Sequence, residues 1–131
     1  MAAPNIMNAN AVYGKTAYLT PSVNTAVILL PNQPGSNQVY KINSITAANS
    51  DGINAINTTI SIYSNGVIAQ NSAPQGGTAF PLVSTVSVPA NASLIVVDKS
   101  NAFYLEENTS IAVTSGAANK ITYIVSYESI T

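Results

Sequence analysis

The chain has 131 residues and a net charge of −1, and it contains no histidine, cysteine, tryptophan or arginine. Four lysines and five acidic residues are its only charged side chains, whereas 47% of its residues are hydrophobic. This composition lacks the usual nucleophile–base pairs of catalysis, has no basic patch for nucleic acid and is too apolar for charge-driven disorder.

The length suits one domain, which we place over residues 11–131 behind an arm over residues 1–10. The first residues have neither a charged n-region nor an apolar h-region, so no signal peptide is expected. The longest apolar run, 26–30, is too short to cross a bilayer. We therefore expect a protein that is made and used in the cytoplasm, or exported only as part of a particle, and that does not bind membranes.

The arm over residues 1–10 is uncharged, rich in Asn and Ala, and without apolar periodicity. Two interpretations have equal weight. The arm is held against a neighbouring subunit, or it adds an edge strand to its own domain.

Beyond the arm, apolar and polar residues alternate with a period of two, which is typical of half-buried strands. In 56–63 the isoleucines point one way, and Asn57, Thr59 and Ser61 point the other. Val, Ile, Thr and Tyr dominate these runs, as strands prefer. The predicted strands, in chain order, are 11–19, 25–30, 39–47, 56–63, 82–88, 93–98, 110–114 and 121–127.

Turn residues separate the runs. Asn65-Gly66 is a strong two-residue turn signal, and loops are expected at 31–35, 51–52 and 76–77. Tight turns are expected at 89–91 and 106–108. About eight short strands with this spacing predict an all-β antiparallel sandwich, either Ig-like or jelly-roll in its connectivity.

So few charges leave the outer faces to Asn, Ser, Thr, Ala and leftover apolar side chains. A soluble monomer usually has a more charged surface, so we expect apolar patches covered by partners. We expect contacts from the arm and from a long loop over 73–80, for which a surface hairpin tip is the equal alternative. The candidate contact residues are Pro4, Asn5, Ile6, Tyr13, Pro74, Gly76, Gly77 and Phe80.

Acid–base chemistry would have to use the five acidic residues, Asp51, Asp98, Glu106, Glu107 and Glu128. The adjacent glutamates face opposite ways in an extended segment, so a catalytic pair is not expected. The stretch 49–52 slightly resembles a calcium loop but lacks the further ligands, and we interpret it as a turn. No catalytic residue, metal site or cofactor is expected, and the protein is not expected to be an enzyme.

Seven tyrosines are the most adaptable binding groups: Tyr13, Tyr18, Tyr40, Tyr63, Tyr104, Tyr123 and Tyr127. Tyrosine favours interfaces because it buries area and keeps a polar tip. The plain alternative is that most belong to the core or rim of the sandwich. A sugar-binding surface is a further alternative, weakened by the absence of tryptophan and arginine.

Several strand and turn segments share a pattern: YKINSI at 40–45, ANSDGINA at 48–55, VSVPA at 86–90, LIVVDK at 94–99, YLEE at 104–107 and VSYE at 125–128. Over these segments the chain resembles a family of small virion structural proteins of tailed bacteriophages. Residues 1–39 do not match, and Asn108-Thr109 replaces the usual glycine-acid turn. This N-terminal extension is where such a member would attach.

The resemblance implies a non-enzymatic β-sandwich that decorates a capsid and cements neighbouring subunits. Its partners would be the major capsid protein or other virion proteins. A trimer on a capsid threefold is the favoured homo-oligomer. The implied location is the virion, assembled in the host cytoplasm. The alternatives are a neck, tail or fibre component of the same particle, and a carbohydrate-binding module.

Overall fold

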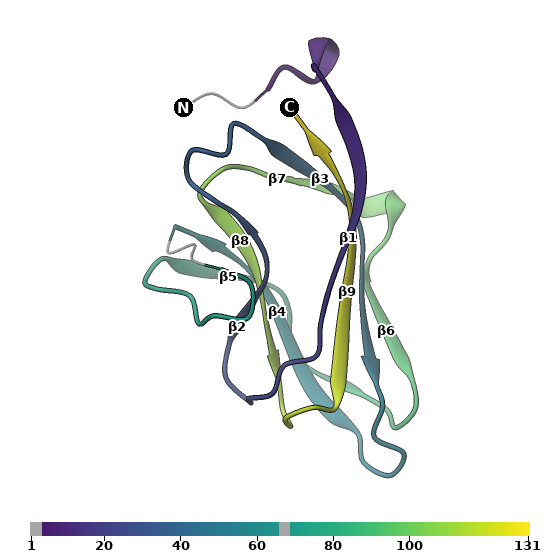
Figure 1. Ribbon diagram of the computed structural model, residues 1–131. Helices are drawn as coiled ribbons and strands as arrows, with labels where there is room; N and C mark the ends of the chain where they lie inside the picture. Colours follow the sequence, from purple (N-terminus) through teal and green to yellow (C-terminus); the bar gives the residue numbers. More distant parts are fainter. Residues whose placement is uncertain (1–3, 66–68) are drawn as a thin grey trace.

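The computed structural model describes residues 4–65 and 69–131, which fold into two packed antiparallel sheets (Figure 1). The predicted all-β sandwich is therefore confirmed. Its elements, in chain order, are η1 (Ile6–Asn8), β1 (Val12–Leu19), β2 (Val27–Asn32), β3 (Val39–Asn49), β4 (Ile56–Ser64), β5 (Thr78–Val88), β6 (Ser93–Val97), η2 (Lys99–Asn101), β7 (Phe103–Leu105), β8 (Thr109–Ser115) and β9 (Ile121–Ile130).

The strand order decides the connectivity that the sequence left open. One sheet has the order β1-β9-β3-β6, with β7 also paired to β3, and the other has the order β2-β8-β4-β5. The pairs are nested, because the first strand pairs with the last and the second with the last but one. An Ig sandwich keeps its first two strands in one sheet, whereas β1 and β2 lie in different sheets here. The fold is a jelly roll.

All eight predicted strands are present, and β7 is an additional short strand. The predicted loop over 73–80 is wrong at its C-terminal end, because β5 begins at Thr78. Phe80 and Pro81 therefore lie in a strand. Proline hides this strand from a pattern search, yet an edge strand such as β5 tolerates it.

The two-residue turn predicted at Asn65-Gly66 falls partly outside the described residues, and within the described part no strand follows it directly. Asn65 has the positive φ of a turn residue, 65°, but the next strand begins only at Thr78, and Gly66 lies outside the described residues. The connection instead reaches the edge of β2. The Asn71 amide donates to the Ile28 carbonyl at 2.8 Å, and the Ile28 amide donates to the Ser72 carbonyl at 2.9 Å.

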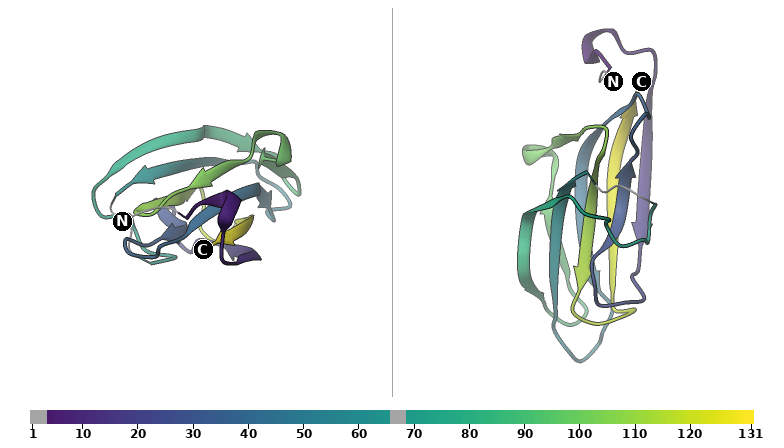
Figure 2. Two further views of the ribbon diagram at one scale, coloured as in Figure 1. Left: turned by 90° about the horizontal axis from the view of Figure 1, so that it is seen from above. Right: turned by 90° about the vertical axis from the view of Figure 1, so that its left-hand side faces the viewer.

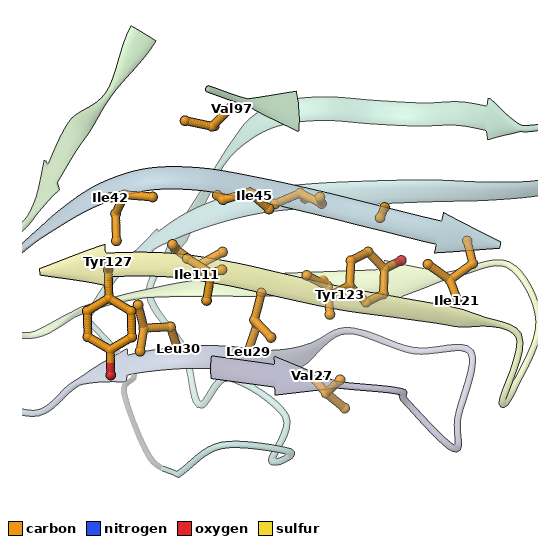
Figure 3. Packing of buried hydrophobic residues seen from close by; sticks show 14 of the residues in the cluster. Val27, Leu29, Leu30, Ile42, Ile45, Val97, Ile111, Ile121, Tyr123 and Tyr127 are labelled. Carbon is orange, nitrogen blue, oxygen red and sulfur yellow. The ribbon is translucent and has the colours of Figure 1, made fainter. Parts of the chain in front are cut away.

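The core lies between the sheets (Figure 3). On most strands it is built from alternate positions, whereas on β2 the adjacent Leu29 and Leu30 both belong to it at a register shift. On β9, Ile121, Tyr123 and Val125 are fully buried, as their alternation predicts. They face residues of the other sheet such as Leu29 and Ile111, which are also fully buried. Each such side chain contributes about 1.5–3 kcal/mol through burial.

Buried polar side chains tie the two sheets and their loops together. The Asn49 side chain donates to the Val88 carbonyl at 3.0 Å, and the Asn32 side chain donates to the Leu105 carbonyl at 2.9 Å. The Tyr123 hydroxyl bonds to the Thr58 hydroxyl across the sandwich. Burial raises the pKa of Tyr123 to about 12, so this hydroxyl stays neutral and hydrogen-bonded at ordinary pH.

The backbone explains much of the asparagine content. Positive φ angles occur at six asparagines among the described residues: Asn37, Asn65, Asn71, Asn91, Asn108 and Asn119. Asparagine adopts the left-handed conformation more readily than most residues other than glycine. The predicted turns at 89–91 and 106–108 are confirmed, since each lies between two strands and ends at or beside one of these asparagines.

The described part of the arm projects beyond one end of the sandwich, beside the C-terminus (Figure 1). It is not extended throughout, because Ile6–Asn8 form a 3-10 turn whose N-cap, Asn5, accepts a hydrogen bond from the Met7 amide at 3.0 Å. Pairing with the domain begins only where the Asn10 amide donates to the Thr131 carbonyl at 2.7 Å. Residues 4–9 therefore do not form an edge strand, and residues 1–3 lie outside the described residues.

Candidate interaction surfaces

The first candidate surface is the outer edge of β1. This strand pairs with β9 in an unbroken register from Val12 opposite Ile130 to Leu19 opposite Tyr123. The Thr131 amide donates to the Ala11 carbonyl at 2.9 Å, and the Ala11 amide donates back at 3.4 Å. Because hydrogen-bonded positions alternate in an antiparallel ladder, odd-numbered residues bond to β9. Even-numbered residues direct their amides and carbonyls away from the sheet.

One part of this edge is covered and another is open. The Gln70 side chain donates to the Tyr18 carbonyl at 3.1 Å, which confirms that an even-numbered position faces outward. Within residues 4–65 and 69–131, no hydrogen bond is formed by the outward backbone groups of Val12, Gly14 or Thr16. Residues 12–16 are exposed, so the open edge extends from Val12 to Thr16.

The second candidate surface crosses the outer face of the same sheet. Tyr18 is opposite Ile124, Ile124 is opposite Thr46, and Thr46 is opposite Ile95. These residues form one lateral row from β1 to β6, in which Tyr18 is 70% exposed, Ile124 42% and Ile95 66%. We call these four residues the apolar row.

The apolar row was not predicted from the sequence, although a signal was present. Ile124 lies at an outward position between Thr122 and Ser126, on a strand whose alternate residues Tyr123 and Val125 are buried. An isoleucine on the polar face of a strand marks an exposed apolar side chain. The lateral alignment with Tyr18 and Ile95 depends on strand pairing and could not be obtained without the fold.

The arm supplies exposed apolar side chains near the open edge. Met7 is 96% exposed and Ile6 51%. Of the contact residues expected there, Asn5 caps the 3-10 turn, Pro4 is half-buried, and Tyr13 is exposed on β1.

The predicted contact loop lies elsewhere, beside the edge of β2 and the start of β5, and the structure does not bring it together with the arm (Figures 1 and 2). Gly77 has a φ of 76°, and a Cβ there would lie 2.2 Å from the Ser64 carbonyl oxygen. Gly76 also has a positive φ, whereas Pro74 is half-buried. These three residues shape the turn into β5, while the exposed Phe80 remains free for contacts.

The tyrosines divide between core and surface. Tyr123 and Tyr127 are buried, and Tyr40 packs on Tyr127 with ring centroids 4.9 Å apart. Burial raises the pKa of Tyr40 and of Tyr127. Tyr63 is half-buried, and Tyr13, Tyr18 and Tyr104 are exposed.

The acidic side chains support loops. Asp51 accepts the amide hydrogens of Ile53 and Asn54 at 2.8 and 3.1 Å, and these bonds lower its pKa. The stretch 49–52 is therefore a turn closed by Asp51. Asp98 caps η2 through Ser100, which lowers the pKa of that carboxyl.

Two further carboxylates are also engaged. Glu107 accepts the Gly35 amide at 2.8 Å, and Glu128 accepts the Asn43 side-chain amide at 3.2 Å. In the part of the chain that the structure describes, no three His, Cys, Asp or Glu residues group together as a metal site. Within the same residues, none of the helices has the length and apolarity to cross a membrane.

Comparisons with known proteins give limited similarity. No family model and no curated protein matches the chain. A solved structure described as "Structure of infectious bursal disease virus Gx strain" aligns with a TM-score of 0.33 at 9% identity; the match covers 93% of this chain and 40% of that one. Another, "Cyanophage Pam1 capsid asymmetric unit", aligns with a TM-score of 0.32 at 15% identity, covering 99% and 91%. Similarity at this level establishes no relationship of function.

Proposed function

We propose that the protein is a non-enzymatic structural component of a virion, which works by adhering to other protein chains. The observation that carries this proposal is the apolar row, which crosses the sheet from β1 to β6 in a nearly uncharged chain. Tyr18, Ile124 and Ile95 are exposed in it, and Thr46 is half-buried. Exposed apolar surface that continues across several strands marks an interaction site.

We further propose that the chain decorates a capsid and cements its neighbouring subunits. The resemblance of 40–45, 48–55 and 125–128 to tailed-phage virion proteins supports this assignment. The jelly roll is compatible with it by analogy, since capsid domains use this fold, as do lectins and cupins. A neck, tail or fibre position in the same particle is the alternative within this class.

The adhesion would combine several weak contacts. The apolar row offers uncharged exposed side chains, and the arm offers Ile6 and Met7 at the end of the sandwich. Each contact alone is small, but a repeating lattice presents many at once and raises the effective affinity. In this arrangement the exposed Tyr18 would be buried between chains.

A second candidate is a carbohydrate-binding module. Tyr104 is opposite Lys41, which is opposite Glu128 on β9, so Tyr104 and Tyr18 lie on the same outer face, and both are exposed. Binding of the purified chain to a glycan array, lost in Tyr18→Ala and Tyr104→Ala variants, would favour this candidate.

The virion proposal is tested by immunogold electron microscopy of purified particles from the source, with an antibody against this chain. Regular label over the head is the result expected for a decoration protein. Label confined to the neck, tail or fibres would favour the alternative position, and particles without label would overturn the virion proposal.

Co-sedimentation of labelled protein with the same particles tests the role of the apolar row. We expect Ile95→Asp to weaken binding about tenfold or more, because a charge would be buried at the contact. Ile53→Asp is the matched control, since Ile53 is 87% exposed in a loop away from the row. Equal binding by the two variants would remove the row from the contact.

A further inference from the structure

The sheets have exposed edges, and three of them are protected. The edge of β2 is covered at Ile28 by Asn71 and Ser72. The edge of β5 is interrupted by Pro81, by two register shifts against β4, and by Thr85 with a φ of 52°. The third edge is divided between β6 and β7, which pair with different ends of β3. Such devices prevent strands from pairing with other chains.

The edge of β1 has none of these devices. Its register is unbroken over eight residues, it contains no proline, and Lys15 is its one charged residue. Among residues 4–65 and 69–131, nothing bonds to the outward amides and carbonyls of Val12, Gly14 and Thr16. Alternating donors and acceptors on a regular strand are satisfied together by another extended backbone.

We propose that β1 pairs with β1 of a second copy of this chain, antiparallel along residues 12–16. The pairing is symmetric, so it closes as a two-fold dimer. Each copy contributes the same three outward positions, which gives roughly six backbone hydrogen bonds.

The charge of Lys15 and the groups already hydrogen-bonded at the two ends of the open edge decide the register of the β1–β1 pair. Centring the pair on Gly14 places Val12 opposite Thr16 and Tyr13 opposite Lys15 of the second copy. Centring it on Lys15 would place two like charges directly opposite each other, which is unfavourable. It would also use the Tyr18 carbonyl, which Gln70 already occupies.

The three remaining registers also meet occupied groups. Centring on Val12 places Gly14 opposite Asn10, whose amide donates to the Thr131 carbonyl. Centring on Thr16 again needs the backbone of Tyr18. Centring on Tyr13 needs the backbone of Asn10, whose amide donates to the Thr131 carbonyl. Only the pairing about Gly14 is confined to the open groups.

The dimer would join the two sheets that contain β1 into one continuous sheet. The outer face would then carry two copies of the apolar row, one on each side of the two-fold axis. Because the strands run antiparallel, each arm would pass toward the Tyr18 end of the other copy, where the exposed Ile6 and Met7 add apolar contacts. This inference stands on the edge itself and does not depend on the proposed virion role.

The test uses proline at an outward position. We expect the intact protein to show a dimer mass by light scattering over a concentration series. Thr16→Pro removes an outward amide without removing a bond to β9, so we expect it to be monomeric at the same concentrations. Thr16→Val retains the amide and is expected to remain a dimer. Thermal melts followed by circular dichroism would check that both variants fold.

Charge exchange tests the register. Tyr13→Lys places a lysine opposite Lys15 of the second copy, and we expect dimer dissociation to increase about fivefold or more. Adding Lys15→Glu to that variant restores opposite charges across the pair, so the double variant is expected to dimerise again.

A monomeric intact protein, a trimer, or a dimer that persists in Thr16→Pro would overturn the inference. The trimer favoured from the sequence needs a different contact, and its mass separates it from the two-fold pair. None of these results changes the outcome of particle labelling, so the failures of the two proposals are distinguishable.

Discussion

The strands β1 and β5 are both edge strands, one in each sheet, but they present different edges. Along β1 the register with β9 is unbroken. Along β5 the register with β4 shifts twice, and Pro81 has no amide hydrogen to donate. The backbone of Thr85 is in the left-handed conformation. Both strands are mostly exposed, with polar and apolar residues on their surfaces. Exposure of side chains therefore does not distinguish the two edges, whereas regularity of the backbone does.

The difference indicates that only one of these edges is suited to pair with another chain. A bent edge with a missing donor cannot continue a sheet, and natural proteins use such features to prevent edge-to-edge association. A regular edge without them is a liability in a monomer, but it is a usable surface in an assembling protein.

The largest expected effect comes from a proline substitution in β1 at a residue whose amide bonds to β9, compared with the same substitution at the neighbouring residue. Ala17 lies at an odd-numbered position and bonds to β9, so Ala17→Pro should lower the free energy of unfolding by about 3 kcal/mol or more. Thr16→Pro should cost far less, because its amide faces outward. Urea unfolding of both variants checks this, and equal losses would contradict the alternation assigned to β1.

The turn into β5 should be nearly as sensitive. Gly77→Ala places a methyl group against the Ser64 carbonyl in a left-handed backbone, so we expect a loss of roughly 2–3 kcal/mol. Thermal unfolding measures it. Gly76→Ala is the matched control, since Gly76 has the same φ of 76° but no atom within 4 Å of the added Cβ, and it should lose less.

The irregularity of β5 at Thr85 should cost stability in the folded chain. A β-branched residue is strained at a φ of 52°, so Thr85→Gly should raise the free energy of unfolding by about 0.5–1 kcal/mol. The hydrogen bond from the residue 85 amide to the Thr59 hydroxyl remains available in this variant. A destabilised variant would show that the residue is not strained.

The smallest effect is expected at Gly14 in β1. A Cβ there would meet nothing within 4 Å, and the φ angle is not in the left-handed region. Gly14→Ala should therefore add about 0.5 kcal/mol by reducing the freedom of the unfolded chain. The methyl group lies on the outer face, so the mass in solution should not change; a shift to monomer would contradict the pairing geometry.

The fold class and most strands could be predicted from the sequence. At 56–63 and 121–127 apolar and polar residues alternate, which indicates strands with one face in the core and the other toward solvent. The sequence could not decide between Ig-like and jelly-roll connectivity, since strand order depends on contacts between residues far apart in the chain. Nor could it show that the connection from β4 to β5 passes along the edge of β2, where Asn71 and Ser72 bond to Ile28.

The candidate surfaces were predicted only in part. The arm and Tyr13 were expected to make contacts, and the structure exposes Ile6, Met7 and Tyr13. The apolar row and the open edge of β1 were not predicted. Both are properties of pairing register, which places Tyr18, Ile124 and Ile95 in line and leaves even-numbered amides outward.

Hydrogen exchange at individual β1 amides tests the central claim most directly. The amides of Tyr13 and Ala17 bond to β9, so they should be protected at every protein concentration. The amides of Gly14 and Thr16 should be protected in concentrated protein and exchange freely on dilution. Fast exchange of Gly14 and Thr16 at all concentrations, beside protected Tyr13 and Ala17, would contradict pairing of β1 with a second copy.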